Sequence, residues 1–286
     1  MITKVAALQM CSSENIDDNL QTAYRLIGEA AQQGAKLIAL PEMFPLTSYQ
    51  NDKRIYIHET FGQGKIQDFL SHTAKEYGVW LVGGTIPIRG AEGPKVYAAC
   101  LVYNDQGQCV GRYDKIHLFD VTLSATEFYR ESDTIRPGNQ SVVIDTPFGK
   151  LGLAVCYDVR FPELFNELFA KGAQIIALPS AFTLKTGAAH WHVLTRARAV
   201  DTFCYVLAPA QGGLHASGRE TYGHSIIVDP WGRIIAEGDA NTVGVIYADI
   251  NLDEVKRVRE AIPIADYKCH PLEDHKCHPR ESGDPV

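Results

Sequence analysis

The chain carries an internal repeat, and this feature constrains its fold more than any other. Residues 34–41 read GAKLIALP and residues 172–179 read GAQIIALP, so six of the eight positions are identical. Each copy follows a stretch whose apolar residues recur at helical spacing, in residues 19–33 and 161–171. Two helix–strand units of the same kind in one chain predict a pseudo-twofold α/β architecture.

Further matching segments extend the repeat. Residues 97–107 and 222–232 share a pattern of Tyr, apolar residues, Asn or Asp and Gly, which predicts strand, turn and strand in both halves. Each half also opens with an apolar strand, at residues 5–9 and 151–155. Strands that are apolar on both faces are typical of sheets covered on both sides. If each half supplies one sheet, the helices lie outside, so we predict a four-layer α-β-β-α sandwich.

Composition and charge exclude several classes of protein. The net charge is −7 and no run of Lys or Arg forms a basic face, so we expect no nucleic-acid partner. No apolar run approaches the ~18 residues of a membrane span, and we expect no membrane partner. The N-terminal segment does not read as a signal peptide, and the seven cysteines are an odd number. Both features favour a cytoplasmic protein with reduced thiols.

Three segments place a reactive side chain beside an apolar stretch. Glu42 follows the strand LIAL and a proline, at the strand end where α/β sheets place functional groups. Lys115 lies in RYDKIHLFD, whose apolar residues favour burial. Cys156 ends the strand of residues 151–155 just before a helix, as the nucleophile of a strand–helix elbow does. The alternatives are a capping carboxylate, a surface charge and an inert buried thiol.

The three segments, LPEMF, RYDKIHLFD and GLAVCYDVRFPEL, resemble in order the Glu, Lys and Cys motifs of the nitrilase superfamily of carbon–nitrogen hydrolases. The segment ESDTIRPG resembles the one that carries the family's second glutamate, here Glu131. The resemblance covers residues 1–265 as one domain and leaves residues 266–286 as a disordered tail. It implies the same α-β-β-α sandwich and a homodimer or higher homo-oligomer.

The resemblance also implies a mechanism. Cys156 attacks an amide carbonyl to give a thioester, while Glu42 takes the thiol proton and returns one to the leaving ammonia. The ammonium of Lys115 and the backbone N–H of Tyr157 stabilise the oxyanion, and Glu131 orients Lys115 or the substrate. We expect Lys115 to lower the pKa of the thiol. No cofactor is expected, because the sequence contains no nucleotide-binding or metalloprotease motif.

Smaller features narrow the substrate. The Cys156-Tyr157-Asp158 sequence differs from the Cys-Trp-Glu usual in nitrilases, which points to amides rather than nitriles. Residues 180–200 and 208–215 resemble the amidase branch that hydrolyses deaminated glutathione. The neighbouring omega-amidases, which act on 2-oxoglutaramate and 2-oxosuccinamate, remain the alternative. A carbamoyl-amine hydrolase and an inactive binding or scaffolding member of the family are the other readings.

Both substrate types carry a carboxylate, so we expect a guanidinium in the site. Arg160 is the candidate, and the alternative is a structural salt bridge to Asp158 or Glu163. Phe182 and Thr186 follow a strand end in the second half and are expected to line the pocket. The tail repeats Lys-Cys-His-Pro at residues 268–271 and 276–279, but no zinc-binding framework surrounds the two copies, so we expect no metal.

Overall fold

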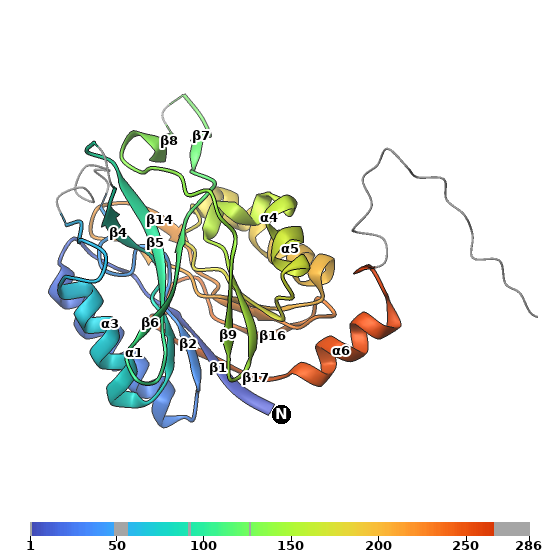
Figure 1. Cartoon of the computed structure of the whole chain (residues 1–286). Helices are drawn as coiled ribbons and strands as arrows, with labels where there is room; N and C mark the ends of the chain where they lie inside the picture. The colour runs from blue at the N-terminus through green and yellow to red at the C-terminus, as the bar shows by residue number, and fades with distance from the viewer. Residues whose placement is uncertain (1, 49–56, 91–92, 126, 266–286) are drawn as a thin grey trace, which may run out of the picture.

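The computed structural model describes residues 2–48, 57–90, 93–125 and 127–265. Figure 1 shows α1 and α3 on one side of the strands and α4 and α5 on the other. The helices have these bounds: α1 Ile16–Gln32, α3 Lys65–Tyr77, α4 Pro162–Ala170, α5 Leu184–Thr202 and α6 Leu252–Ala261. The predicted tail at residues 266–286, with its Lys-Cys-His-Pro copies, lies outside the described residues. Among the helices of the described part, none is long and apolar enough to cross a membrane.

The first half of the chain builds one sheet, whose far edge comes from the C-terminal part. Its path runs β17-β1-β2-β3-β5-β4, and β6 also pairs with β5. The strands are β1 (Ile2–Gln9), β2 (Leu37–Ala39), β3 (Trp80–Val82), β4 (Ile86–Arg89), β5 (Val96–Tyr103), β6 (Cys109–Asp114) and β17 (Gly244–Asn251). The strands β1, β2 and β3 are parallel neighbours, whereas β17 pairs with β1 in the antiparallel sense.

The second half builds a sheet of matching order, β16-β15-β12-β11-β10-β9. Its strands are β9 (Val142–Thr146), β10 (Gly149–Leu153), β11 (Ile175–Ala177), β12 (Tyr205–Ala208), β15 (Ile226–Val228) and β16 (Ile234–Glu237). The strands β10, β11 and β12 are parallel neighbours, as β1, β2 and β3 are. Even the register shift recurs, between β5 and β6 and between β15 and β16. The repeat predicted from the sequence therefore corresponds to the same order and pairing of strands in the two sheets.

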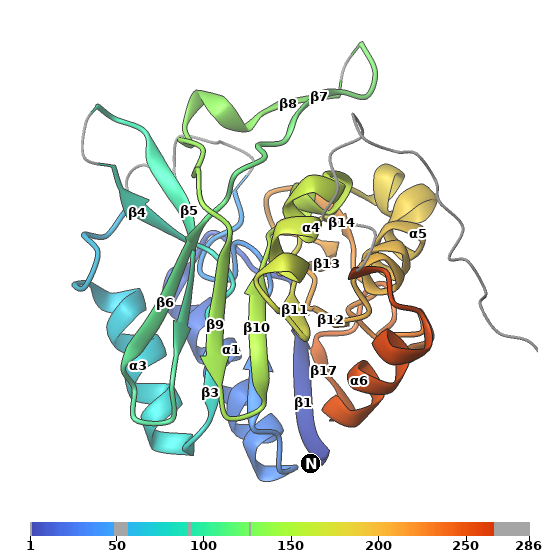
Figure 2. The same ribbon diagram turned by 45° about the vertical axis from the view of Figure 1, so that its right-hand side comes forward.

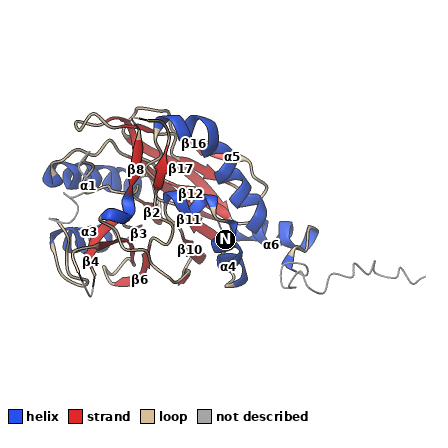
Figure 3. Cartoon of the chain, turned by 90° about the horizontal axis from the view of Figure 1, so that it is seen from above, coloured by secondary structure: helices blue, strands red, loops and turns tan. Residues whose placement is uncertain are grey.

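Alternation along β1 shows how the layers pack. Val5 and Ala7 belong to the core between the two sheets, while Ala6 and Leu8 belong to the core beneath α1 and α3. A strand that is apolar on both faces is the sequence pattern that a doubly covered sheet requires. The views in Figures 2 and 3 show the strands between the two helix layers, so the predicted four-layer sandwich is confirmed.

Local signals set the ends of the helices. The side chain of Asn15 caps α1 by accepting hydrogen bonds from the backbone N–H groups of Asp17 and Asp18. Pro162 is the first residue of α4, where the missing N–H of proline costs nothing. The Oγ1 of Thr183 accepts from the backbone N–H of Thr186 and caps α5. This last cap fixes the chain beside the carboxyl end of β11.

Two short strand pairs lie beyond the main sheets. They are β7 (Asp120–Thr122) with β8 (Phe128–Arg130), and β13 (Gly212–Leu214) with β14 (Glu220–Tyr222). Figure 1 shows β7 and β8 projecting past the ends of the sheets. The 3₁₀ turns η1 (Glu131–Asp133) and η2 (Cys156–Arg160) follow β8 and β10. These outlying segments and turns carry many of the side chains of the site.

Candidate active site

Cys156 stands at a strained turn between β10 and α4. Its φ is +48°, a left-handed conformation that a residue with a Cβ rarely adopts. The backbone N–H of Cys156 donates to the carbonyl of Pro179 at 2.9 Å, which ties the turn to the end of β11. The N–H of Tyr157 lies in the first turn of η2, where backbone donors have no acceptor within the helix. The elbow expected from the sequence is therefore formed.

A buried carboxylate holds this elbow in place. Asp158 Oδ2 accepts the backbone N–H of Val155 at 2.8 Å and the hydroxyl of Tyr113 at 2.7 Å. Its Oδ1 accepts the backbone N–H of His117 at 3.0 Å and lies 2.7 Å from His117 Nδ1. Asp158 thus joins the elbow to the segment that carries Lys115, and His117 has a structural role in this connection.

Three buried charges meet beside the thiol. Lys115 Nζ lies 2.8 Å from Glu42 Oε1 and 2.8 Å from Glu131 Oε2, and the three side chains are only 1%, 5% and 9% exposed. Glu131 Oε2 also accepts the backbone N–H of Phe119 at 2.7 Å. The three residues follow β2, β6 and β8, so their meeting depends on the packing of the whole first half. We call Glu42, Lys115 and Glu131 the buried charge cluster.

Burial and charge act on the ionisation of this group. Burial disfavours the charge of Lys115, but Glu131 and Glu42 outweigh it, so the pKa of Lys115 is raised above its ordinary value. Burial and the Glu42 carboxylate raise the pKa of the Cys156 thiol well above its usual range, against the smaller opposing effect of Lys115. The sequence-based expectation of a lowered thiol pKa is wrong, because it counted Lys115 and neither burial nor Glu42.

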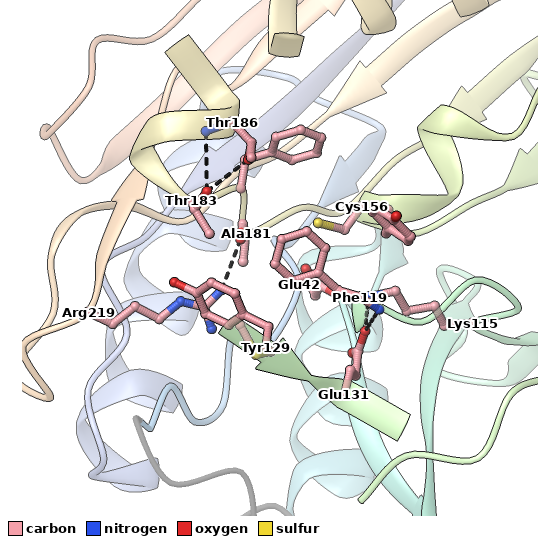
Figure 4. A pocket seen from close by; sticks show the side chains of 13 residues that line it. Glu42, Lys115, Phe119, Tyr129, Glu131, Cys156, Ala181, Thr183, Thr186 and Arg219 are labelled. Atoms are coloured by element: carbon pink, nitrogen blue, oxygen red, sulfur yellow. Dashed lines mark hydrogen bonds and ion pairs between the residues drawn. The ribbon is translucent and has the colours of Figure 1, made fainter. Parts of the chain in front are cut away.

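The thiol and the buried charge cluster open onto one pocket of about 500 Å³. Figure 4 shows the side chains that line it, with Cys156 facing the cavity. They are Glu42, Met43, Lys115, Phe119, Tyr129, Glu131, Cys156, Tyr157, Ala181, Phe182, Thr183, Thr186 and Arg219. The structure therefore places Glu42, Lys115, Glu131 and Cys156 around one pocket with Phe182 and Thr186.

Arg160 is the predicted site residue that does not line this pocket. Its guanidinium lies over the rings of Tyr157 and Phe182, 5.7 Å and 5.6 Å from their centroids, and Nη2 is 3.3 Å from His190 Nδ1. Both oxygens of Asp158 already accept other donors, so the structure does not form the alternative salt bridge to that residue. Arg160 instead packs against two aromatic side chains that line the pocket.

The sequence left six residues of the lining unpredicted: Met43, Phe119, Tyr129, Ala181, Thr183 and Arg219. Phe119 and Tyr129 pack together with their centroids 5.1 Å apart, and Phe119 also packs against Tyr157. Arg219 comes from the turn between β13 and β14, and its Nη2 donates to the carbonyl of Ala181 at 3.2 Å. No local pattern marks this arginine, because it reaches the pocket through the path of an irregular loop.

One group of side chains in the described part has the composition of a metal site. His192 Nε2 and His224 Nδ1 lie 2.7 Å and 2.9 Å from Glu237 Oε1. None of the three lines the catalytic pocket. The imidazoles and the carboxylate satisfy one another by hydrogen bonds, so we assign the group to the packing of α5 against β16.

The chain is similar in sequence and in fold to several known proteins. Residues 4–260 match the family described as carbon-nitrogen hydrolase. The deaminated glutathione amidase of Yersinia enterocolitica is 41% identical over 92% of each chain. The omega-amidase NIT2 of Xenopus tropicalis is 38% identical over 93% of this chain and 95% of its own. The crystal structure of Saccharomyces cerevisiae Nit3, a member of branch 10 of the nitrilase superfamily, superposes with a TM-score of 0.85 at 35% identity, covering 94% and 97% of the two chains.

The chain belongs to the carbon–nitrogen hydrolase family. It is an amide-hydrolysing enzyme, and the family resemblance read from its three motifs is confirmed.

Proposed function

We propose that the enzyme hydrolyses the amide of a small carboxylate-bearing substrate through a thioester on Cys156. One observation carries this proposal. The buried Cys156 thiol, the Glu42 carboxylate and the Lys115 ammonium face one pocket, and the ammonium lies 2.8 Å from the carboxylate. A nucleophile, a proton acceptor and a positive charge within reach of one another are the groups that acyl transfer from an amide requires.

The raised pKa of Cys156 decides how the attack proceeds. A raised pKa favours the thiol over the thiolate, so we propose that the proton leaves as the sulfur attacks. Glu42 accepts that proton, the C–S bond forms, and the carbonyl oxygen gains a negative charge. The Lys115 ammonium and the backbone N–H of Tyr157 stabilise this oxyanion. The C–N bond then breaks as Glu42 returns the proton to the leaving nitrogen.

Hydrolysis of the thioester reverses these roles. Glu42 removes a proton from water, the hydroxide adds to the thioester carbon, and the thiol leaves with a proton from Glu42. Glu131 is a positioning residue in both halves of the reaction. It shares Lys115 with Glu42 and anchors the backbone of Phe119, so it holds the ammonium in place while Glu42 changes its charge.

Deaminated glutathione is the substrate we propose. The support is the 41% identity to relatives named deaminated glutathione amidase, together with the segments 180–200 and 208–215. Omega-amidase activity on 2-oxoglutaramate or 2-oxosuccinamate is the second candidate, and it is favoured by relatives of that name at 38% and 39% identity. Phe182 and Thr186 would contact the acyl group, and we retain Arg160 as the candidate for its carboxylate.

Side-by-side kinetics test this proposal. The protein is assayed with deaminated glutathione, 2-oxoglutaramate and 2-oxosuccinamate, and the 2-oxo acid formed is measured. We expect the largest kcat/KM for deaminated glutathione. A larger value for 2-oxoglutaramate or 2-oxosuccinamate would assign an omega-amidase. Release of carbon dioxide from carbamoyl amines would assign the other hydrolase class, and no turnover of any amide would leave the binding or scaffolding reading.

We also propose a cytoplasmic homodimer or higher homo-oligomer. The five cysteines of the described part are all free thiols, which suits a reducing compartment. On α5, Val193 and Val200 are 68% and 43% exposed and lie seven residues apart, hence on one face. The exposed Trp231 lies near this face. Its neighbour Gly232 accepts a hydrogen bond from Arg196 of α5 at 2.7 Å. Light scattering on Val193→Asp should show a smaller particle than the wild type if this face joins two copies.

A further inference from the structure

A second hollow adjoins the catalytic pocket and shares three of its residues, Tyr129, Thr183 and Arg219. This outer groove holds about 1600 Å³ of space open to solvent, compared with about 500 Å³ for the pocket. Its walls come from β8, the start of α5 and the turn before β14. When an acyl group occupies the pocket at Cys156, a substituent on the amide nitrogen can extend past the three shared residues into the groove.

Arg219 lies at this boundary, and one of its several N–H groups donates a hydrogen bond to another described residue. One Nη2–H donates to the carbonyl of Ala181 at 3.2 Å, and the guanidinium lies 5.7 Å from the centroid of the Tyr129 ring. Figure 4 shows Arg219 beside Tyr129 and joined to Ala181. Its Nε is buried and has no hydrogen-bond partner among the described residues. A buried donor without an acceptor is unfavourable, so this atom is the place where a ligand oxygen would be most effective.

The charges of the lining make a carboxylate the fitting acceptor. Among the described residues, the cations that line the pocket are Lys115 and Arg219. Lys115 is already held by two carboxylates at 2.8 Å. Arg219 has no ion pair to a carboxylate in the described part, and a guanidinium binds a carboxylate through two parallel hydrogen bonds. A neutral amide oxygen would satisfy the same donor without the attraction of opposite charges.

We propose that Arg219 binds a carboxylate carried by the leaving half of the substrate. The favoured substrates are then amides whose nitrogen belongs to an acidic amino acid or to a short peptide with a free carboxylate, in preference to primary amides. This inference rests on the proposed function and adds a leaving-group subsite to it. The acyl half stays with Cys156, and the charged amine half lies across Arg219 in the outer groove.

The test uses three substrates with the same acyl group. In 2-oxoglutaramate the leaving group is ammonia, in deaminated glutathione it is a peptide with a free carboxylate, and in the C-terminal amide of deaminated glutathione it is the same peptide without that charge. Arg219→Gln should lower kcat/KM for deaminated glutathione about 10–100-fold, mainly through KM, which is the scale of a charge-assisted hydrogen bond. The other two substrates should change less than about threefold, because they never used that bond.

Two further variants sharpen the result. Arg219→Lys keeps the charge and loses the planar fork, so it should recover part of the loss on deaminated glutathione. Arg25→Gln removes the same charge from an exposed position on α1 and should leave all three rates at the wild-type value. An equal loss on all three substrates in Arg219→Gln would overturn the proposal, because Arg219 would then act through Ala181 and the thiol. An unchanged kcat/KM for deaminated glutathione would also overturn it.

Binding without turnover separates this inference from the proposed function. Calorimetry on Cys156→Ala should show deaminated glutathione bound at least about tenfold more tightly than by Cys156→Ala/Arg219→Gln. Equal binding by the two, or binding by neither, overturns the role of Arg219. Failure of the wild type to hydrolyse any of the three substrates overturns the proposed function, whichever way the binding comparison falls.

Discussion

Replacing Lys115 by methionine tests the energetics of the buried charge cluster. The change leaves the carboxylates of Glu42 and Glu131 facing each other with no cation between them, at side-chain exposures of only 5% and 9%. Removing one partner of a buried ion pair costs about 3–5 kcal/mol, a large fraction of the ~5–15 kcal/mol by which domains are stable. The corresponding fall in melting temperature is about 6–20 °C at the 2–4 °C per kcal/mol typical of large chains.

The pH dependence gives a second and independent readout. A group whose folded pKa lies above its unfolded value stabilises the protein at every pH below the unfolded value, and loses this only as pH rises through the folded pKa. The raised pKa of Lys115 therefore keeps its contribution constant at any pH below its ordinary value of 10.5. In Lys115→Met, a proton taken up by either carboxylate removes the repulsion. The deficit relative to wild type should therefore shrink as the pH falls from 8 to 5.

Urea unfolding followed by tryptophan fluorescence, at pH 5, 6, 7 and 8, measures these differences. The control is Lys65→Met, which removes an exposed ion pair with Asp17 and should cost less than about 1 kcal/mol. Adding Glu42→Gln and Glu131→Gln to Lys115→Met should recover more than half of the loss, since no unpaired charge remains. The reasoning is refuted if Lys115→Met costs no more than the control, or if its deficit is the same at pH 5 and pH 8.

The remaining predictions concern reactivity. Cys156→Ala and Cys156→Ser should keep the fold by circular dichroism and lose several orders of magnitude in amide hydrolysis, and wild-type product formation by either would exclude a thioester. Because the pKa of Cys156 is raised, the rate of its alkylation by iodoacetamide should still be increasing with pH at pH 9. Glu42→Gln removes a neighbouring negative charge and should move this increase to lower pH. An unchanged pH profile in Glu42→Gln would contradict the effect of the Glu42 carboxylate on the pKa of the thiol. Arg160→Lys should weaken acid-bearing amides by about 1–3 kcal/mol in kcat/KM and spare neutral amides, whereas equal losses would make Arg160 a support for Phe182.

The sequence predicted the fold well because the repeat leaves little freedom. GAKLIALP and GAQIIALP both end a parallel strand, and the apolar runs around them require cover on both faces. The boundaries were less accurate. The strand expected at residues 151–155 ends at Leu153, because the chain already turns at Val155 to enter η2. Side-chain periodicity reports which face is buried and carries little information on where pairing stops.

The sequence indicated the three motifs of the site. It did not indicate the contacts that the residues of the site make in the folded protein. Glu42, Lys115 and Cys156 have local signatures, because each follows a recognisable strand. The raised pKa of the Cys156 thiol has no local signature in the sequence, since burial is a property of the assembled core. Arg219 and Tyr129 reach the pocket from a loop and from the short strand β8, whose paths depend on tertiary packing. A charged residue in such a segment looks like surface until the fold is known.

The two halves of the repeat have unequal shares in the chemistry, and this explains why the enzyme needs both. The position after the proline of the repeat is Glu42 in the first copy, where it takes part in the buried charge cluster. In the second copy that position is Ser180, whose hydroxyl donates to the carbonyl of Leu178, and the next residue, Ala181, lines the pocket. The Glu42 carboxylate and the Lys115 ammonium of the site therefore come from one sheet, and the thiol comes from the other. Because the carboxyl ends of β2 and β11 lie together in the assembled sandwich, the Cys156 thiol and the Glu42 carboxylate face one pocket only when both sheets are packed.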